Sequence, residues 1–261
     1  MNYNLPFIPE RIAKPRESGL TMMKDKGLSL REAEAFCETS ASYTDLVKFG
    51  FGTALIVKNL KEKIKLYRDA GVEPYFGGTL FEMFAVRNML DDYQRFVDQF
   101  GITTIEISDG SMKIDPEDKV QMIKRFAVSK RVLSEVGTKV KGINIPNEDW
   151  VQHMKAELEA GAWKVIAEAR ESGTIGIYNS DGSANRELID DIIKEISVDA
   201  VLWEAPAKAQ QVMFIQLVGA NVNLGNIAPN EAFSLEALRL GMRGDTFFDY
   251  LPAEFQDKRQ Q

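Results

Sequence analysis

The dominant feature of this 261-residue chain is a repeated unit: a short apolar stretch ends in charged residues, then a glycine-containing turn and a helical pattern follow. The clearest copy is the stretch 105–111, where isoleucines alternate with Glu106 and Ser108 before Asp109 and a glycine end the strand period. Copies of the same shape occupy 21–27, 46–50, 165–170 and 201–206. Strands that alternate with helices predict a parallel sheet.

Eight strand and helix pairs can be counted along the chain. The expected strands cover about 20–25, 44–49, 72–76, 102–108, 132–136, 163–168, 199–204 and 221–224. Eight such units in about 250 residues favour closure into a TIM barrel, the α/β fold in which helices surround eight parallel strands. A doubly wound open sheet is the alternative, but no Gly-x-Gly-x-x-Gly motif follows the first strand. We expect one TIM-barrel domain over residues 1–261, with a short irregular N-terminal lead-in and a C-terminal tail.

Local signals place helices between these strands. Ser29 and Glu32 have the spacing of a capping box for the first helix. Asp115, followed by proline, predicts the start of the helix after the fourth strand. One long helix is expected over about 80–100.

Composition limits the partners and the chemistry. The net charge is −7, so nucleic acid is a poor match, because it needs a basic face. No apolar run approaches the roughly 20 residues of a membrane span, and no signal-peptide pattern is recognisable, so we expect a cytoplasmic protein without a membrane partner. A homo-oligomer remains open. The chain has one histidine and one cysteine, so a zinc site is not expected and proton transfer must use other side chains.

Polar residues at the strand ends should converge on one mouth of the barrel, where TIM-barrel enzymes have their active sites. Each of these residues could equally serve in a structural ion pair. The carboxylates among them form a pool of ligands for a divalent metal, and Mg²⁺ suits hard oxygen ligands best. This pool consists of Asp25, Glu106, Asp109, Glu168 and Glu204. The cationic candidates indicate an anionic substrate, and they are Lys26, Lys48 and Arg170.

A phosphate group is expected near the last two strands, because barrels commonly bind phosphate there. Gly225 and Asn226 precede a helix and could offer backbone N–H groups to an anion, and Asn223 is a further candidate for substrate binding. Arg170 suits a bidentate contact with phosphate. Arg16, in a basic stretch before the first strand, is a reserve candidate.

Several ordered motifs, spread over about residues 12–250, resemble one known family. They are Lys14-Pro15-Arg16, Asp25-Lys26-Gly27, Lys48-Phe49-Gly50, Gly77-Gly78-Thr79-Leu80-Phe81-Glu82, Ile105-Glu106-Ile107-Ser108-Asp109-Gly110, Glu168-Ala169-Arg170-Glu171-Ser172-Gly173, Glu204-Ala205-Pro206 and Asn223-Leu224-Gly225-Asn226-Ile227. Together they resemble phosphosulfolactate synthase. The resemblance implies a TIM-barrel lyase that adds sulfite to phosphoenolpyruvate with Mg²⁺ to give 2-phospho-3-sulfolactate, the reaction that opens coenzyme M biosynthesis in methanogens.

Plant heat-stress-associated proteins are also similar, and they leave two other functions open. One is Mg²⁺-dependent addition or enolisation on another phosphorylated carboxylate. The other is a non-catalytic, stress-associated barrel. The many ionisable groups at the strand ends argue against the non-catalytic function, because burying unneeded charge is costly.

The resemblance also bears on the fifth strand. Periodicity alone allows a helix up to Glu135 followed by a strand at 139–145, or a strand at 132–136. The family has a strand followed shortly by a lysine, which matches Lys139 and favours the second arrangement, with 142–146 in a loop.

Addition of sulfite would build charge on the substrate carboxylate, and an acid must then protonate the phosphate-bearing carbon. Lys139 is the first candidate for this acid, with Lys48 and Lys26 behind it, because crowding by cations lowers the pKa of a lysine.

Overall fold

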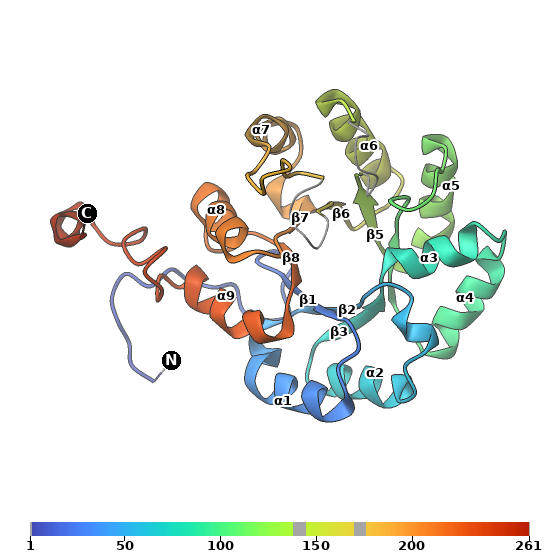
Figure 1. Ribbon diagram of the computed structural model, residues 1–261, viewed down its shortest axis with the longest axis horizontal. Coiled ribbons are helices and arrows are strands. Elements are labelled where there is room, and N and C mark those ends of the chain that lie inside the picture. Colours follow the sequence, from blue (N-terminus) through green and yellow to red (C-terminus); the bar gives the residue numbers. More distant parts are fainter. Residues whose placement is uncertain (1, 138–144, 170–175, 261) are drawn as a thin grey trace.

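The structure is a computed structural model that describes residues 2–137, 145–169 and 176–260. Eight parallel strands form a closed barrel in sequence order, and helices surround it (Figure 1). The strands are β1 (Thr21–Asp25), β2 (Leu46–Phe49), β3 (Glu73–Phe76), β4 (Thr104–Ile107), β5 (Arg131–Val136), β6 (Lys164–Ala167), β7 (Val201–Glu204) and β8 (Leu224–Ile227). The TIM barrel predicted from the repeat is confirmed, and so is a fifth strand at 132–136.

Helices follow the strands around the barrel. They are α1 (Leu30–Ser40), α2 (Leu60–Asp69), α3 (Gly78–Ala85), α4 (Leu90–Gln99), α5 (Pro116–Ala127), α6 (Asn147–Glu159), α7 (Arg186–Glu195), α8 (Lys208–Val218) and α9 (Ala232–Arg239). Short 3₁₀ helices are η1 (Ala41–Tyr43), η2 (Thr53–Leu55), η3 (Val198–Ala200), η4 (Pro229–Glu231) and η5 (Ala253–Lys258). The capping box of Ser29 and Glu32 is present at α1, and Asp115 caps α5.

The prediction of a single helix over 80–100 is wrong, because α3 and α4 are separate helices. Asn88, between them, has a φ of 57°, which a continuous helix excludes.

Alternate residues of each strand face opposite sides of the barrel wall. A small apolar cluster fills the barrel interior, and it consists of Leu20, Met22, Leu46, Tyr75, Leu133, Ile166 and Leu202. A much larger apolar cluster lies between the strands and the surrounding helices. Because the side-chain period of a strand is two, the residue two positions beyond an interior residue also points inward, toward the carboxyl end of the barrel.

The eighth strand begins three residues later than predicted. Leu224 pairs with Thr21 of β1, so Asn223 comes before β8 rather than at its carboxyl end. Gly225 and Asn226 consequently lie within the strand. The prediction failed here because Asn221, Val222, Asn223 and Leu224 already alternate polar and apolar residues as a strand does, so the pattern alone starts the strand too early.

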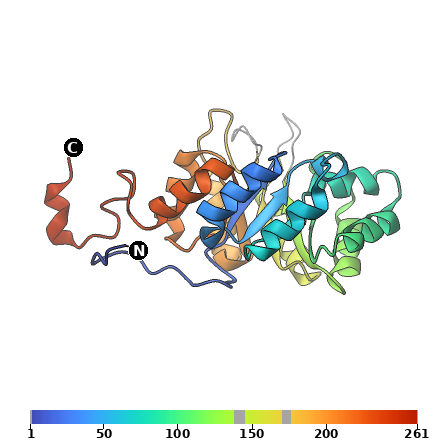
Figure 2. The ribbon, with the colours of Figure 1, turned by 90° about the horizontal axis from the view of Figure 1, so that it is seen from below.

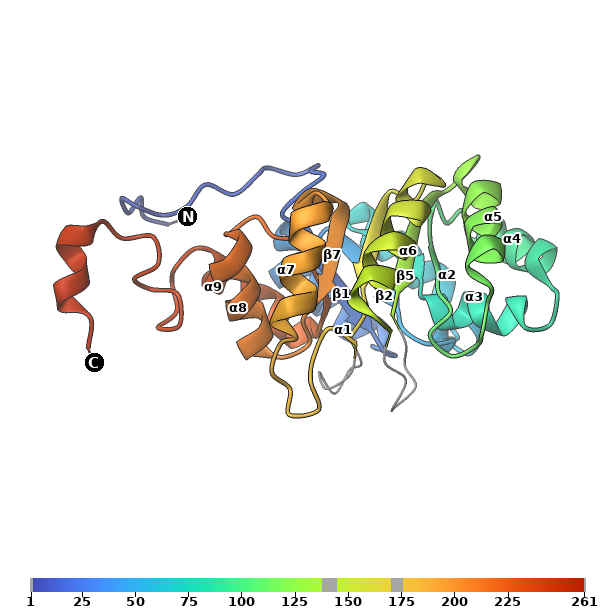
Figure 3. The same ribbon diagram turned by 90° about the horizontal axis from the view of Figure 1, so that it is seen from above.

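The N-terminal lead-in lies at the amino end of the barrel, and the loop 176–185 lies at the opposite end (Figure 3). Arg11 ties the lead-in to α9 through an ion pair with Glu236 at 2.9 Å, and it also donates to the carbonyl of Ala220. The two terminal segments extend together to one side of the barrel, where the rings of Phe7 and Phe255 lie 5.7 Å apart (Figures 1 and 2). Within the described ranges, no helix has the length and apolar character that a membrane span requires.

Candidate active site

A buried lysine surrounded by three glutamates lies at the carboxyl end of the barrel interior. Lys48 Nζ is 2.9 Å from Glu106 Oε2, 3.2 Å from Glu204 Oε1 and 3.6 Å from Glu135 Oε2. The three acids come from β4, β5 and β7, and all four side chains are almost fully buried. We call this set of Lys48, Glu106, Glu135 and Glu204 the Lys48 cluster.

Glu106 is fixed by groups from β3 and from the start of α3. Tyr75 donates its hydroxyl to Glu106 Oε2 at 3.0 Å, and the N–H of Gly78 donates to Oε1 at 2.6 Å. Gly77 and Gly78 leave the space that this arrangement needs. A Cβ at Gly77 would lie 3.2 Å from Lys48 Cε, and a Cβ at Gly78 would lie 2.9 Å from Glu106 Oε1. The two consecutive glycines therefore let α3 begin directly against the cluster.

Glu204 and Glu168 occupy the neighbouring part of the mouth. Glu204 Oε2 accepts a hydrogen bond from the N–H of Ala169 at 2.9 Å, which links β7 to the end of β6. Glu168 comes directly after β6 and is fully buried. A Cβ at Gly137, the residue after β5, would lie 3.0 Å from Glu168 Oε2, so this carboxylate approaches the end of β5. Glu168 and the Lys48 cluster thus lie on adjoining strands at one end of the barrel.

The charges of the cluster act strongly on one another. Burial alone would lower the pKa of Lys48, but the nearby carboxylates of Glu106, Glu204 and Glu135 outweigh it and raise the pKa above its ordinary value. Burial raises the pKa of Glu204, against the opposing charge of Lys48. Lys48 is therefore a permanent positive charge and a poor proton donor at neutral pH, because an acid works best when its pKa is near the working pH.

Two predicted metal ligands lie outside this cluster. Asp25 faces α2, where it pairs with Lys63 at 2.5 Å and accepts the hydroxyl of Tyr67 at 2.8 Å. Asp109 pairs with Lys119 of α5 at 2.9 Å, on the outer side of the barrel wall. Both acids follow the strand ends as predicted, but their contacts join strands to helices rather than line the mouth.

The predicted cation Lys26 is also away from the cluster. Its side chain is exposed in the turn after β1, beside a cavity of about 320 Å³ that the start of α2 lines. Lys139 and Arg170, predicted as the acid and as a phosphate ligand, lie outside the described residues. Of the three lysines predicted to act in catalysis, the described part of the structure brings Lys48 alone into the barrel interior.

The predicted substrate-binding residues of the last strand are spread along it. Asn223 lies at the amino end of the barrel, where its side chain accepts the N–H of Leu20 at 3.0 Å and donates to the carbonyl of Val201 at 3.1 Å. Gly225 faces the interior, where a Cβ would come within 2.7 Å of Met22 Cε. Asn226 is buried near the carboxyl end with a φ of 57°, and its Oδ1 accepts no hydrogen bond from the described residues. Asn226 is thus the member of this group that remains near the mouth.

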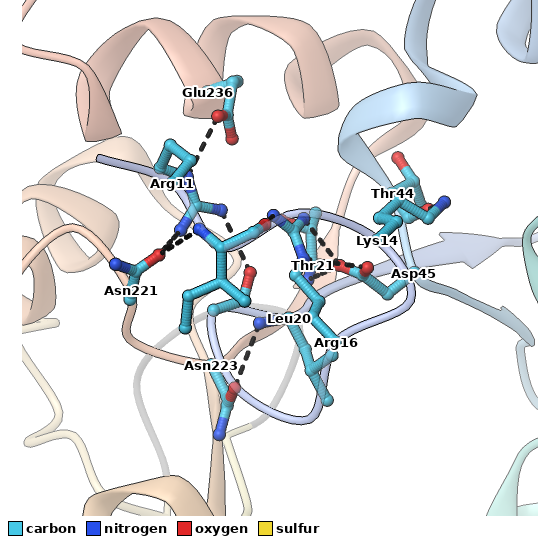
Figure 4. Close-up of polar contacts among 12 residues, drawn as sticks. Arg11, Lys14, Arg16, Leu20, Thr21, Thr44, Asp45, Asn221, Asn223 and Glu236 are labelled. Atoms are coloured by element: carbon cyan, nitrogen blue, oxygen red, sulfur yellow. Dashed lines mark hydrogen bonds and ion pairs between the residues drawn. The ribbon is translucent and has the colours of Figure 1, made fainter. Parts of the chain in front are cut away.

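Arg16 lies at the amino end of the barrel, beside Asp45 and Thr21 (Figure 4). Its guanidinium forms two hydrogen bonds of 2.9 Å with the carboxylate of Asp45, just before β2. Asp45 also accepts the N–H of Thr21 at 2.8 Å, so the pair closes the amino end of the barrel between β1 and β2. A phosphate bound at the mouth is out of reach of Arg16.

Three residues that face the interior were not predicted as site residues: Lys24, Tyr75 and Glu135. A period-two signal was present for Lys24 and Glu135, because Met22 and Leu133 are interior residues two positions before them. Tyr75 itself belongs to the interior apolar cluster, and its hydroxyl reaches the carboxylate of Glu106. Counting two positions onward from Met22 and Leu133 would have found Lys24 and Glu135.

The expected Mg²⁺ can be tested against the donor chemistry of the mouth. One ammonium against three carboxylates leaves the Lys48 cluster with two net negative charges when all four groups are ionised. The described residues contain no group of three acidic, histidine or cysteine side chains arranged around a metal position. Mg²⁺ usually binds through one or two protein carboxylates together with water and substrate oxygens, so such a cage is not required. The net negative charge and the carboxylate oxygens at the mouth are of the chemical type that such an ion binds.

Comparison with known proteins agrees on one family. The profile of (2R)-phospho-3-sulfolactate synthase (ComA) matches residues 9–245. A phosphosulfolactate synthase of Bacillus subtilis is 41% identical over 244 residues, covering 92% of this chain and 97% of that protein. One of Methanothermobacter thermautotrophicus is 42% identical over 245 residues, covering 91% and 95% of the two chains.

Solved structures share the fold at low sequence identity. The 3-hexulose-6-phosphate synthase of Salmonella typhimurium has a TM-score of 0.54 at 14% identity, over 86% of this chain and 100% of that chain. The BexX/CysO complex of Amycolatopsis orientalis has a TM-score of 0.55 at 15% identity, over 94% of this chain and 96% of that chain. These similarities support the barrel fold alone.

Proposed function

Because the chain belongs to the (2R)-phospho-3-sulfolactate synthase family, we propose that it adds sulfite to phosphoenolpyruvate to form 2-phospho-3-sulfolactate. The observation that carries this proposal is family membership over nearly the whole chain, together with the buried Lys48 cluster at the end of the barrel where TIM-barrel enzymes act. The charged mouth favours a small, ionised substrate over an apolar one.

The proposed reaction has two steps. The sulfur lone pair of sulfite attacks the methylene carbon of phosphoenolpyruvate, a C–S bond forms, and the electron pair of the double bond moves toward the carboxylate as an enediolate. An acid then protonates the phosphate-bearing carbon, and no group leaves. Mg²⁺, when bound by Glu168 and Glu204, would supply positive charge for the enediolate.

The residues of the chain have separate roles in this proposal. Glu106 fixes Lys48, and Gly78 and Tyr75 fix Glu106, so the positive charge is preorganised rather than assembled during the reaction. The raised pKa of Lys48 argues against its use as the acid. Lys139 stays the proposed acid, on the family resemblance alone.

The test is a direct assay of the purified protein. It is mixed with phosphoenolpyruvate, sulfite and Mg²⁺, and the phosphorus NMR signals of substrate and product are followed with time. Conversion of phosphoenolpyruvate that depends on sulfite supports the proposal. Reaction without sulfite, or with other phosphorylated carboxylates instead, would assign the barrel to a different addition or enolisation. No reaction with any of them would point to a non-catalytic barrel.

A further inference from the structure

A second lysine points into the mouth of the barrel beside the Lys48 cluster. Lys24 belongs to β1 and pairs in register with Lys48 of β2. Leu20 and Met22, at the preceding positions of the same face, belong to the interior apolar cluster, so the strand period directs Lys24 inward too. Two lysines therefore stand side by side on neighbouring strands.

The two lysines differ in depth. Lys48 is buried among its carboxylates, whereas Lys24 is only partly buried. The stem of Lys24 passes close to Gly50, where a Cβ would lie 3.0 Å from Lys24 Cε. Burial raises the pKa of Glu204, and the positive charges of Lys48 and Lys24 both oppose this rise. The charge of Lys24 therefore acts on Glu204. Lys24 is thus a partly exposed lysine next to the Lys48 cluster.

The head group of Lys24 lies against the aromatic ring of Phe51, a residue with an unusual backbone conformation. Lys24 Nζ lies 4.7 Å from the ring centroid of Phe51, in the loop that follows β2. Phe51 has a φ of 55°, which is disfavoured for a bulky residue, and its side chain is 44% exposed. Burial of the ring therefore offsets little of the cost of this conformation. Backbone strain of this kind persists where the position of the side chain matters for function, and a ring against an ammonium is a favourable cation–π contact.

We propose that Lys24, positioned by Phe51, binds an oxyanion group of the substrate at this mouth. The proposal rests on the proposed function, in which both phosphoenolpyruvate and sulfite are anions. The Lys48 cluster carries two net negative charges when its four groups are ionised, and this charge repels an approaching anion. A partly exposed ammonium next to this cluster supplies the attraction that an anionic substrate needs.

Three substitutions and one control test the assignment. Lys24→Met removes the charge at similar length, Lys24→Arg keeps it, and Phe51→Leu removes the ring while keeping a side chain that meets the same backbone strain. Lys65→Met is the control, because Lys65 is 75% exposed on the outer helix α2 and undergoes the same chemical change. Thermal unfolding of all four variants verifies that each is folded.

Binding is measured by isothermal titration with phosphoenolpyruvate and with sulfite, each alone, so that the readout does not depend on turnover. Lys24→Met should weaken binding of one or both anions by about 10-fold or more, the loss expected for a hydrogen bond to a charged group. The anion whose affinity falls identifies the oxyanion that Lys24 contacts. Phe51→Leu should weaken binding of the same anion by about 2- to 5-fold, whereas Lys24→Arg and Lys65→Met should retain it.

The outcomes separate this inference from the proposed function. If Lys24→Met binds both anions as tightly as the unchanged chain does, Lys24 is not a substrate ligand, whatever the turnover assay gives. If the unchanged chain binds phosphoenolpyruvate but does not consume it with sulfite, the proposed reaction is wrong. In that case a loss of binding in Lys24→Met still assigns Lys24 to an anion site.

Discussion

Lys48 Nζ lies 2.9 Å from Glu106 Oε2 in the closed interior of the barrel, with both side chains almost fully buried. Glu135 and Glu204 approach the same ammonium. A single positive charge therefore holds the carboxyl ends of β4, β5 and β7 to β2. Lys48 therefore contributes to the stability of the barrel and also lies at the proposed active site.

Substitution of Lys48 by methionine should strongly destabilise the fold. It leaves three buried carboxylates without their common partner, and breaking a buried pair in this way costs about 3–5 kcal/mol. Urea unfolding at pH 7 measures the loss, with the exposed Lys65→Met as the control, which should stay within about 0.5 kcal/mol of the unchanged chain. A loss of less than about 1 kcal/mol in Lys48→Met would contradict this expectation.

The pH dependence of stability should change when Glu204 is replaced by glutamine. Burial raises the pKa of Glu204 above its ordinary value of 4.5, so the folded chain holds this proton more tightly than the unfolded chain does. The contribution of Glu204 is therefore full below about pH 4.5 and is lost as the pH rises through the folded pKa. The free energy of unfolding of Glu204→Gln, minus that of the unchanged chain, should become more positive as the pH rises above 4.5. Urea unfolding at several pH values measures this difference, and a constant difference would contradict the expectation.

Gly78→Ala should destabilise the protein and impair the site. Its Cβ would lie 2.6 Å from Ser108 Cβ and 2.9 Å from Glu106 Oε1, so the start of α3 must move away from the cluster. Overpacking of this kind costs about 1–3 kcal/mol. Gly244→Ala is a matched control, because a Cβ there meets nothing within 4 Å and the backbone needs no positive φ. Thermal unfolding compares the two variants, and equal melting temperatures would show that α3 shifts without cost.

Arg16→Lys should lower stability without changing substrate affinity. The guanidinium binds both oxygens of Asp45, and lysine cannot reproduce this bidentate contact. We expect a loss of about 1–3 kcal/mol, as for a hydrogen bond to a charged group, and an unchanged Michaelis constant for phosphoenolpyruvate. A raised Michaelis constant at unchanged stability would instead place Arg16 in the substrate site.

The fold was predictable because its signals are local. Each strand is an apolar stretch bounded by turn residues, and the count of eight units led to a closed barrel. The site was less predictable because neighbouring residues at a strand end point to opposite sides of the wall. Asp25 and Lys24 illustrate this: Asp25, which was predicted as a site residue, faces α2, whereas its neighbour Lys24, which was not, faces the interior.

Sequence patterns did not predict at which end of the barrel some residues lie. The three-residue shift of β8 moved Asn223 from the mouth to the amino end of the barrel. Arg16 could be assigned to a closed barrel but not to one of its two ends, because its position depends on Asp45, which lies 29 residues away in the sequence. The lysine and three glutamates of the Lys48 cluster come from four strands, and only the closed barrel brings them together.

The contact between the two terminal segments suggests a way to rearrange the chain. Phe7 and Phe255 lie against each other beside the barrel, so a short peptide could join the two terminal segments near these residues without crossing the fold. New ends could be opened between α5 and β5, where Val128 is 88% exposed and the connection lies at the amino end of the barrel, opposite the mouth. Circular permutation is tolerated best at such exposed connections. The permuted chain should close the same barrel with its ends far from the tail, which frees the original terminal region for immobilisation or fusion.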